Sequence, residues 1–325
     1  MSNKAFDQKL DALLALRDAA DASERLTRLR KALCDRSNYY VAKAAALVAE
    51  FSLTALIPDL IATFDHFLEG GAKFDPQCWG KQAIAEALAE LGHDQPAVFV
   101  KGSAHVQMEP VFGGKEDTAI RLRGACTLAL VQCKWSEYEL LTHLVNILAD
   151  AEKGVRMEAI RAIGQCTARD AALLLRVKAN AGDPEPEVIG QCLATLLEID
   201  AENQLDYVRH FLHAEEDLRF EALVALSECR DPRAVNALVD VINRDEHRAI
   251  RHEIFQVLGR SRHKHAADFL LNAIQTGNTT DAAASIGAVL QGPARESLRV
   301  RVTEIVRQRG TAVLTKQLAT ILAEI

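Results

Sequence analysis

The segment VRMEAIRAIGQC, residues 155–166, decides the fold of this chain because it recurs. It returns as LRFEALVALSEC at 218–229 and as IRHEIFQVLGRS at 250–261. In each copy the residues that we expect in the core stand at positions 1, 5, 8, 9 and 12. At about 100° per residue these positions fall on one stripe of a helix, so each copy predicts an amphipathic helix with one buried side.

Five looser copies extend the pattern toward both ends of the chain. They are YVAKAAALVAEF (40–51), GKQAIAEALAEL (80–91), IRLRGACTLALV (120–131), VIGQCLATLLEI (188–199) and DAAASIGAVLQG (281–292). A second helical stretch lies between successive copies, for example PRAVNALVDVINR at 232–244. Helix pairs that repeat every ~30 to 40 residues predict an α-solenoid, in which stacked repeats bury a continuous core.

This pattern resembles the HEAT repeat family, and in particular its short variety of roughly 30 residues per repeat. The likeness rests on the V/L/I-R-x-E-A openings, which begin at Val155, Leu218 and Ile250 (with Ile254 in place of the Ala). The turn that ends at Pro232, before the next first helix, adds to it. The resemblance implies an all-α, right-handed superhelix of about eight helix pairs.

We expect a single domain, although the length of 325 residues alone suggests two. The expected solenoid spans 1–325 because the repeats run through most of the chain. Residues 1–37 are expected to form an N-terminal cap and residues 293–325 a C-terminal helical cap. An irregular, non-repeat insertion is expected at 93–117, where the periodic pattern breaks.

Composition agrees with a folded, helical chain. Hydrophobic residues make up 49% and charged residues 26%, which is enough apolar material for a core. Aromatic residues make up only 5%, which favours helix over sheet. No apolar run approaches the ~18 residues of a membrane span. Seven cysteines without a CxxC pair predict reduced thiols and a cytoplasmic location.

We expect a non-enzymatic scaffold that binds a protein or peptide partner. The net charge of −7 argues against nucleic acid as that partner. Two alternatives stay open. One is an enzyme or enzyme subunit, because some short HEAT-like repeats resemble the phycobilin chromophore lyases. The other is a nucleic-acid-binding protein similar to the HEAT-like alkylpurine DNA glycosylases.

The partner is expected on the concave face, which the second helix of each pair lines in HEAT-like solenoids. Positions 3 and 10 of the copies point away from the core stripe and carry almost no charge. The candidate binding residues at these positions are Leu122, Met157, Leu197, Phe220 and His252. A weakly polar groove of this kind suits an amphipathic helix or an extended peptide. The alternative is that tight stacking buries these side chains between repeats.

The insertion offers a second group of candidates. Its stretches AVFV (97–100) and HVQM (105–108) alternate like the short strands of a hairpin. In an extended conformation His105, Gln107 and Glu109 project from the same side. One interpretation gives this trio a metal-binding or acid–base role.

The favoured interpretation is that the insertion packs onto the solenoid. A further hypothesis makes it a lid or a specificity element of the concave groove. Long loops of a compact domain usually have a function or lack order, and this one is too apolar for a free linker. The side chains expected to make the packing contacts are Phe99, Val106, Met108 and Phe112.

We expect no metal and no other cofactor. The HEAT-repeat enzyme deoxyhypusine hydroxylase binds two irons through His-Glu pairs that four helices repeat. Here only His252 and Glu253 form such a pair, because Met157 and Phe220 precede the corresponding glutamates. An open iron site needs several converging ligands. The sequence also lacks the GxGxxG, P-loop, GxSxG and HExxH signatures, so we assign no catalytic residue.

Two further residue types recur in the copies. Arginines at position 2 predict a ladder of hydrogen bonds to carboxylates or carbonyls of neighbouring turns. These are Arg121, Arg156, Arg219 and Arg251. Cysteines at core positions are predicted to be small apolar fillers rather than nucleophiles. These are Cys166, Cys192 and Cys229.

Overall fold

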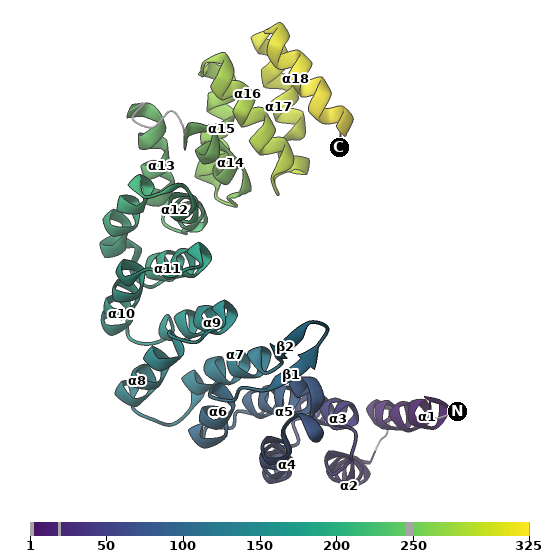
Figure 1. The fold of residues 1–325 in the computed structure, drawn as a ribbon. Coiled ribbons are helices and arrows are strands. Elements are labelled where there is room, and N and C mark those ends of the chain that lie inside the picture. The colour runs from purple at the N-terminus through teal and green to yellow at the C-terminus, as the bar shows by residue number, and fades with distance from the viewer. Residues whose placement is uncertain (1–2, 19–20, 245–249, 325) are drawn as a thin grey trace. The chain divides into compact units, whose positions relative to one another are not determined.

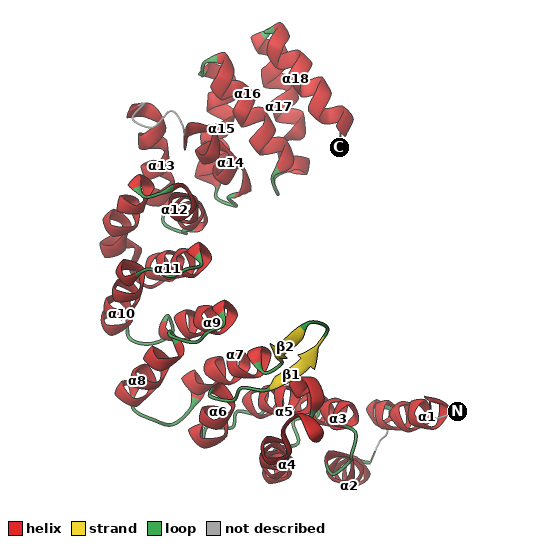
Figure 2. Cartoon of the chain, in the orientation of Figure 1, coloured by secondary structure: helices red, strands yellow, loops and turns green. Residues whose placement is uncertain are grey.

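The computed structural model describes residues 3–18, 21–244 and 250–324 (Figure 1). This part of the chain holds eighteen α-helices, six short 3-10 helices and one β-hairpin (Figure 2). The chain divides into two compact units, Met1–Cys166 and Thr167–Ile325, which we describe separately as the first and the second unit. The predicted all-α class is confirmed.

The part of the first unit that the structure describes contains nine α-helices and the hairpin. The helices are α1 (Asn3–Leu14), α2 (Ala22–Leu33), α3 (Asn38–Glu50), α4 (Ile57–Gly70), α5 (Trp79–Glu90), α6 (Pro96–Ser103), α7 (Ile120–Ala129), α8 (Glu137–Ile147) and α9 (Lys153–Ile163). The strands β1 (Met108–Val111) and β2 (Gly114–Asp117) pair antiparallel, with Met108 opposite Asp117.

The second unit is entirely helical in the part that the structure describes. Its helices are α10 (Ala168–Ala181), α11 (Pro186–His210), α12 (Glu216–Glu228), α13 (Pro232–Arg244), α14 (Arg251–Arg260), α15 (Lys264–Thr276), α16 (Thr279–Gln291), α17 (Arg295–Arg309) and α18 (Ala312–Glu324). The short 3-10 helices of the two units are η1 (Ala15–Arg17), η2 (Thr54–Leu56), η3 (Gly71–Lys73), η4 (Pro76–Cys78), η5 (Leu130–Gln132) and η6 (Phe211–His213).

The eight sequence copies are the second helices of successive pairs. In the first unit they are α3, α5, α7 and α9, and each packs against the next. In the second unit they are the first half of α11, then α12, α14 and α16, again packed in order. The predicted solenoid of stacked helix pairs is therefore confirmed within each unit.

The predicted apolar stripe forms the buried side of these helices. In α9, Val155, Ala159 and Ile163 are fully buried. In α14, Ile254 and Leu258 are buried in the same way. The apolar stripes of neighbouring repeats thus form one continuous core. Stacked repeats gain their stability from such contacts between neighbours.

Position 10 does not face outward as expected. Leu197 and Ser227 are buried there, and so is Gly259. A Cβ atom added to Gly259 would lie 2.4 Å from the backbone oxygen of Ala288 on α16. Within each unit successive second helices pack against one another, so their buried surface is wider than a single stripe.

The predicted arginine ladder is present in part, because Arg156 and Arg251 make it, whereas the buried Nε atom of Arg219 has no hydrogen-bond partner. Arg156 donates to two carbonyls of the turn before α9, each at 2.9 Å. Arg251 on α14 donates to both carboxylate oxygens of Asp281 on α16, at 2.8 and 2.5 Å. Arg121 is exposed, and the buried Arg123 takes its place in the ladder.

In the second unit, α11 joins helices of two neighbouring pairs without a loop. α11 runs through residue 200, where Asp200 alone departs from helical geometry (φ −157°, ψ 69°). The Asp200 carboxylate accepts a hydrogen bond from the backbone N–H of Asn203 at 3.3 Å and so caps the second half of the helix. A single kinked residue therefore joins the second helix of one pair to the first helix of the next.

The insertion is shorter than expected. The stretch 97–100, expected as a strand, lies within the helix α6, which packs on α7. Pro96 begins this helix, at a position where its missing N–H costs nothing. The hairpin is real, but it lies at 108–117, around the turn formed by Phe112 and Gly113. The positive φ of 90° at Gly113 suits that turn.

Candidate functional site

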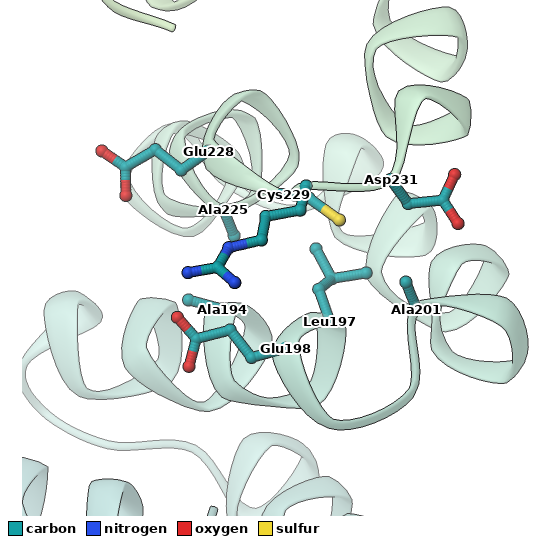
Figure 3. A pocket seen from close by; sticks show the side chains of 9 residues that line it. Ala194, Leu197, Glu198, Ala201, Ala225, Glu228, Cys229 and Asp231 are labelled. Carbon is teal, nitrogen blue, oxygen red and sulfur yellow. The ribbon is translucent and has the colours of Figure 1, made fainter. Parts of the chain in front are cut away.

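Two pockets open at opposite ends of the interface between α12 and the first half of α11, both within the second unit. The acidic pocket, of about 520 Å³, lies at the N-terminal ends and is lined by Glu185, Pro186, Glu187, Glu216, Asp217, Phe220, Glu221 and Glu253. The C-terminal pocket, of about 590 Å³, is lined by Ala194, Leu197, Glu198, Ala201, Ala225, Glu228, Cys229, Arg230 and Asp231 (Figure 3).

Helix starts bring most of the carboxylates into the acidic pocket. Glu185 is the N-cap residue of α11 and Glu187 lies in its first turn. Glu216 and Asp217 lie in the first turn of α12. Carboxylates are favoured at such positions because the helix dipole places partial positive charge there. The half-buried Phe220 follows one turn later, on the same side of α12.

The glutamates of the repeated openings complete this pocket. A Cβ atom on Gly190 of α11 would lie 2.0 Å from the Oε2 atom of Glu221, so the glycine leaves room for that carboxylate. Glu253 enters from α14, with its Oε2 atom 3.6 Å from Nε of Arg219. That oxygen is enclosed and accepts no hydrogen bond. The pocket therefore holds an incompletely satisfied carboxylate.

The C-terminal pocket has a mixed lining. Figure 3 shows Glu198 of α11 and Glu228 of α12 on one side of it, with Leu197 on its floor and Asp231 on the other side. Asp231 is held by Arg233, whose Nη2 atom lies 2.6 Å from Oδ2. The hydrogen bonds from Arg233 lower the pKa of Asp231.

The cysteine of this pocket is not activated. Cys229 is buried, and burial raises the pKa of its thiol. Burial also raises the pKa of Cys192, on α11, to about 12. Both thiols therefore stay protonated at neutral pH, and the thiolate is the reactive form.

The predicted binding residues do not share one surface. Phe220 lines the acidic pocket, and the buried Leu197 lines the C-terminal pocket. His252 is exposed on α14, with Nε2 3.0 Å from the side-chain nitrogen of Gln256. Met157 is half-buried on α9. Leu122 has no exposed surface, so the expectation that it faces outward is wrong.

The insertion trio is brought together, as its alternation predicts. The Nε2 atom of Gln107 donates to Oε1 of Glu109 at 2.7 Å, and His105 Nε2 lies 3.4 Å from Oε1 of Gln107. Gln107 and Glu109 are buried against the solenoid. Lys81 of α5 donates from Nζ to Oε1 of Gln107 at 2.8 Å.

Lys81 and Asp75 form the centre of this cluster at the hairpin base. Neither has any exposed surface, and Lys81 Nζ lies 3.3 Å from Oδ2 of Asp75. Asp75 also accepts hydrogen bonds from Asn38 at 2.8 Å and from the backbone N–H groups of Gly80 and Lys81 at 2.8 and 2.9 Å. The pair is therefore surrounded by partners, as a buried ion pair must be.

Glu109 is held as a carboxylate by its hydrogen bonds. Burial raises its pKa, but hydrogen bonds from Thr118, Gln107 and the backbone of Gln77 outweigh burial and bring the pKa below its usual value. Its Oε1 atom accepts all three bonds, at 2.6 to 2.7 Å. The atoms that a metal or a substrate would use already hold the hairpin in place, so we assign this cluster to structure.

Arg123 fastens the other strand and was not singled out from the sequence. Its Nη1 atom lies 2.5 Å from Oδ2 of Asp117, at the end of β2, and its Nε atom 2.9 Å from Oδ2 of Asp150. Its one signal in the sequence is that an arginine stands at position 4, where three other copies carry Glu.

The hairpin does not cover a groove as expected. Phe99 is fully buried, but in α6 rather than in the hairpin. The other three side chains expected to pack onto the solenoid are exposed: Val106 at 58%, Met108 at 51% and Phe112 at 108% of full exposure. The base of the hairpin is polar and buried, whereas its tip is apolar and projects into solvent.

The class that this architecture defines is an all-α solenoid of HEAT-like helix pairs. Residues 211–291 match the family model of HEAT repeats, which confirms the resemblance seen in the sequence. No curated protein matches the sequence. The chain is similar to a solved structure of the complex of CpcE and CpcF of phycocyanin lyase from Nostoc sp., with 16% identity over 70% of this chain and 88% of that chain and a TM-score of 0.33.

Two negative findings apply to the described residues. No helix among them is long and apolar enough to cross a lipid bilayer. No group of three or more His, Cys, Asp or Glu side chains among them has an arrangement that could hold a metal ion.

Proposed function

We propose that this chain is a non-catalytic scaffold that binds a protein or peptide partner on the second helices of its second unit. The observation that carries the proposal is the acidic pocket. Three successive repeats contribute to it, through α11, α12 and α14. Surfaces shared by consecutive repeats are the ones with which solenoid proteins bind extended partners.

Phe220 is the residue on which we expect a partner to depend most. It is aromatic, half-buried and lies in a pocket rather than on an open surface. Aromatic side chains in pockets are the residues that contribute most binding energy in protein interfaces. The carboxylates around it form a polar rim that favours defined orientations of a partner.

The proposal is tested by affinity capture with a matched pair of variants. Phe220→Asp should reduce capture of the partner from native lysate at least tenfold, as measured by quantitative mass spectrometry. Leu173→Asp is the control, because Leu173 is also an exposed apolar residue of the second unit (60%) but lies on the first helix α10. Its variant should capture as much partner as the parent protein.

Circular dichroism separates loss of binding from loss of fold. Both variants should keep the helical signal of the parent, because Phe220 is not part of the buried stripe of α12. Equal loss of capture in the two variants, or a partner that binds Phe220→Asp as well as the parent, would show that binding does not occur at this surface.

A further inference from the structure

In the first unit, an extended segment of the chain already lies on the N-terminal ends of two second helices. Next to β1, Gln107 accepts a hydrogen bond from Lys81 of α5 at 2.8 Å. At the end of β2, Asp117 pairs with Arg123 of α7 at 2.5 Å. The helices supply the cations, and the extended segment supplies the acceptors. Figure 1 shows the hairpin beside α5 and α7.

Position 2 is basic in both units, as Lys81 in α5 and as Arg219 and Arg251 in the second unit, but the charge at position 4 changes sign. Arg123 stands at position 4 of its copy, and position 4 is Glu221 in α12 and Glu253 in α14. Both glutamates line the acidic pocket. None of the eight residues that line this pocket is Lys, Arg or His. The helix starts that a hairpin covers in the first unit thus border an acidic cavity in the second unit.

Part of the charge in this pocket is free for a ligand. Glu216 and Asp217 are exposed, and neither side-chain carboxylate makes a hydrogen bond or ion pair with any residue that the structure describes. They lie one turn before Phe220 and Glu221 on the same face of α12. A cation placed over the Phe220 ring would therefore meet both carboxylates.

Geometry favours an organic cation over a metal ion. Within residues 3–18, 21–244 and 250–324, no three carboxylates are close enough to coordinate one ion. A guanidinium group instead presents five N–H donors in a plane and reaches separated carboxylates. Its flat face also stacks on an aromatic ring, with an attraction of about 0.5–1 kcal/mol at exposed sites.

We propose that the acidic pocket binds an extended, basic segment of the partner protein, with an arginine or lysine side chain over Phe220. This inference rests on the proposed function and adds the chemistry of the partner. The segment lies at the helix starts, as the hairpin does in the first unit, and its cation meets the glutamates that replace Arg123 at position 4.

A fluorescein-labelled peptide with two arginines in an otherwise neutral sequence is the probe, measured by fluorescence anisotropy with the full chain. Its twin carries citrulline at both positions, which keeps the shape and removes the charge. The arginine peptide should bind at least tenfold more tightly than its twin. Binding should weaken as salt rises from ~50 to ~300 mM, because exposed charges are screened.

Two protein variants locate the binding. Glu216→Gln with Asp217→Asn should weaken binding of the arginine peptide about 10- to 30-fold, from a contribution of about 1 kcal/mol for each exposed charge pair at ~4 Å. Asp170→Asn with Glu202→Gln is the control, because it removes the same charge from exposed positions of the second unit outside the pocket. Phe220→Leu should cost about 2- to 5-fold.

Four outcomes contradict the proposal: no binding of the arginine peptide, equal binding of the citrulline twin, an equal loss in both double variants, or salt-sensitive self-association that Glu216→Gln with Asp217→Asn abolishes. The last result, measured by sedimentation velocity, would assign the pocket to the arginine-rich α17 of a second copy. If Phe220→Asp abolishes partner capture while the two peptides bind equally, the proposed function stands and only this inference fails.

Discussion

At the base of the hairpin, Lys81 and Asp75 are fully buried and each has several partners, whereas Glu216 and Asp217 in the acidic pocket are exposed and their carboxylates have none among the described residues. Both groups lie where second helices begin. In the first unit the hairpin covers the starts of α5 and α7, and the buried charges there hold the hairpin on the solenoid. In the second unit the carboxylates at the helix start stay exposed.

The comparison separates buried, paired charges from exposed ones. In the sequence alone the two kinds of charged residue look the same. Burying an ion pair costs several kcal/mol in desolvation for each ion, and only a complete set of hydrogen bonds offsets this cost. The hairpin base has a complete set of hydrogen bonds around Lys81 and Asp75. Removing either residue therefore leaves the charge of the other buried and unpaired. Glu216 and Asp217 in the acidic pocket are exposed to water, so neutralising them should cost little stability.

The largest effect is expected from Lys81→Met. It leaves the Asp75 carboxylate buried without its cation, which should lower the free energy of unfolding by about 3–5 kcal/mol. Urea denaturation followed by tryptophan fluorescence measures the free energy of unfolding of the first unit, because both tryptophans, Trp79 and Trp135, lie there.

Lys101→Met is the control for Lys81→Met. Its Nζ atom lies 2.7 Å from Asp65, but the lysine side chain is 54% exposed. An exposed pair contributes less than about 1 kcal/mol. Equal losses in the two variants would show that burial does not separate the two kinds of charge.

The second prediction concerns Gly190→Ala in the second unit. The added methyl group meets Glu221 Oε2 at 2.0 Å and its Cβ at 3.0 Å. We expect a loss of about 1–3 kcal/mol, as for overpacking, and a displaced Glu221 carboxylate. Thermal unfolding followed by circular dichroism measures the loss.

Gly287→Ala provides the matched control in α16. No atom lies within 4 Å of the position of its added Cβ, and its backbone is helical. Alanine is the better helix former by ~1 kcal/mol, so this variant should be the more stable one. The reverse order of the two glycine variants would contradict the packing described for α11 and α12.

The third prediction uses pH. The pKa of Glu109 is lower in the folded state, so its contribution is complete above the unfolded value of ~4.3 and is lost as pH falls through the folded value. The first unit should lose stability below about pH 4.3, with at most about 1.4 kcal/mol per pH unit from this proton.

Glu109→Gln should flatten that decline, and Glu116→Gln should not. Glu116 lies directly opposite Glu109 in the hairpin but is exposed. Urea titrations at several pH values, again read by tryptophan fluorescence, give the two slopes. A decline in Glu109→Gln as steep as in the parent would mean that other carboxylates, such as Asp117, control the acid response.

The sequence predicts the fold better than the site, for a physical reason. The apolar positions of each copy, such as 218–229, follow from helical periodicity alone. The eight second helices could therefore be located from the sequence. Whether Leu122 is exposed depends instead on how closely neighbouring second helices pack, which periodicity does not contain. Phe220 could be proposed because an aromatic residue stands off the stripe.

The charged clusters could not be predicted because their members are far apart in the chain. Asp75 and Gln107 are joined across 32 residues at the hairpin base. The acidic pocket draws on three helices, and the repeated glutamates are its only signal in the sequence. Helix-start carboxylates such as Glu216 are expected in any helical protein.

The smallest effect is expected at the tip of the hairpin. Phe112→Ser should change the free energy of unfolding by less than about 0.5 kcal/mol, because the ring is fully exposed and loses no packing. Phe99→Ala, in the buried helix α6, should cost about 3–5 kcal/mol in the same urea titration. These two rings, thirteen positions apart, were expected to pack alike, yet one belongs to the core and the other to the exposed tip. A cost of more than about 1 kcal/mol for Phe112→Ser would mean that the tip packs against the solenoid in solution. The contrast between a covered first unit and an open second unit would then be stronger, since the hairpin would cover more of α5 and α7 than its base alone.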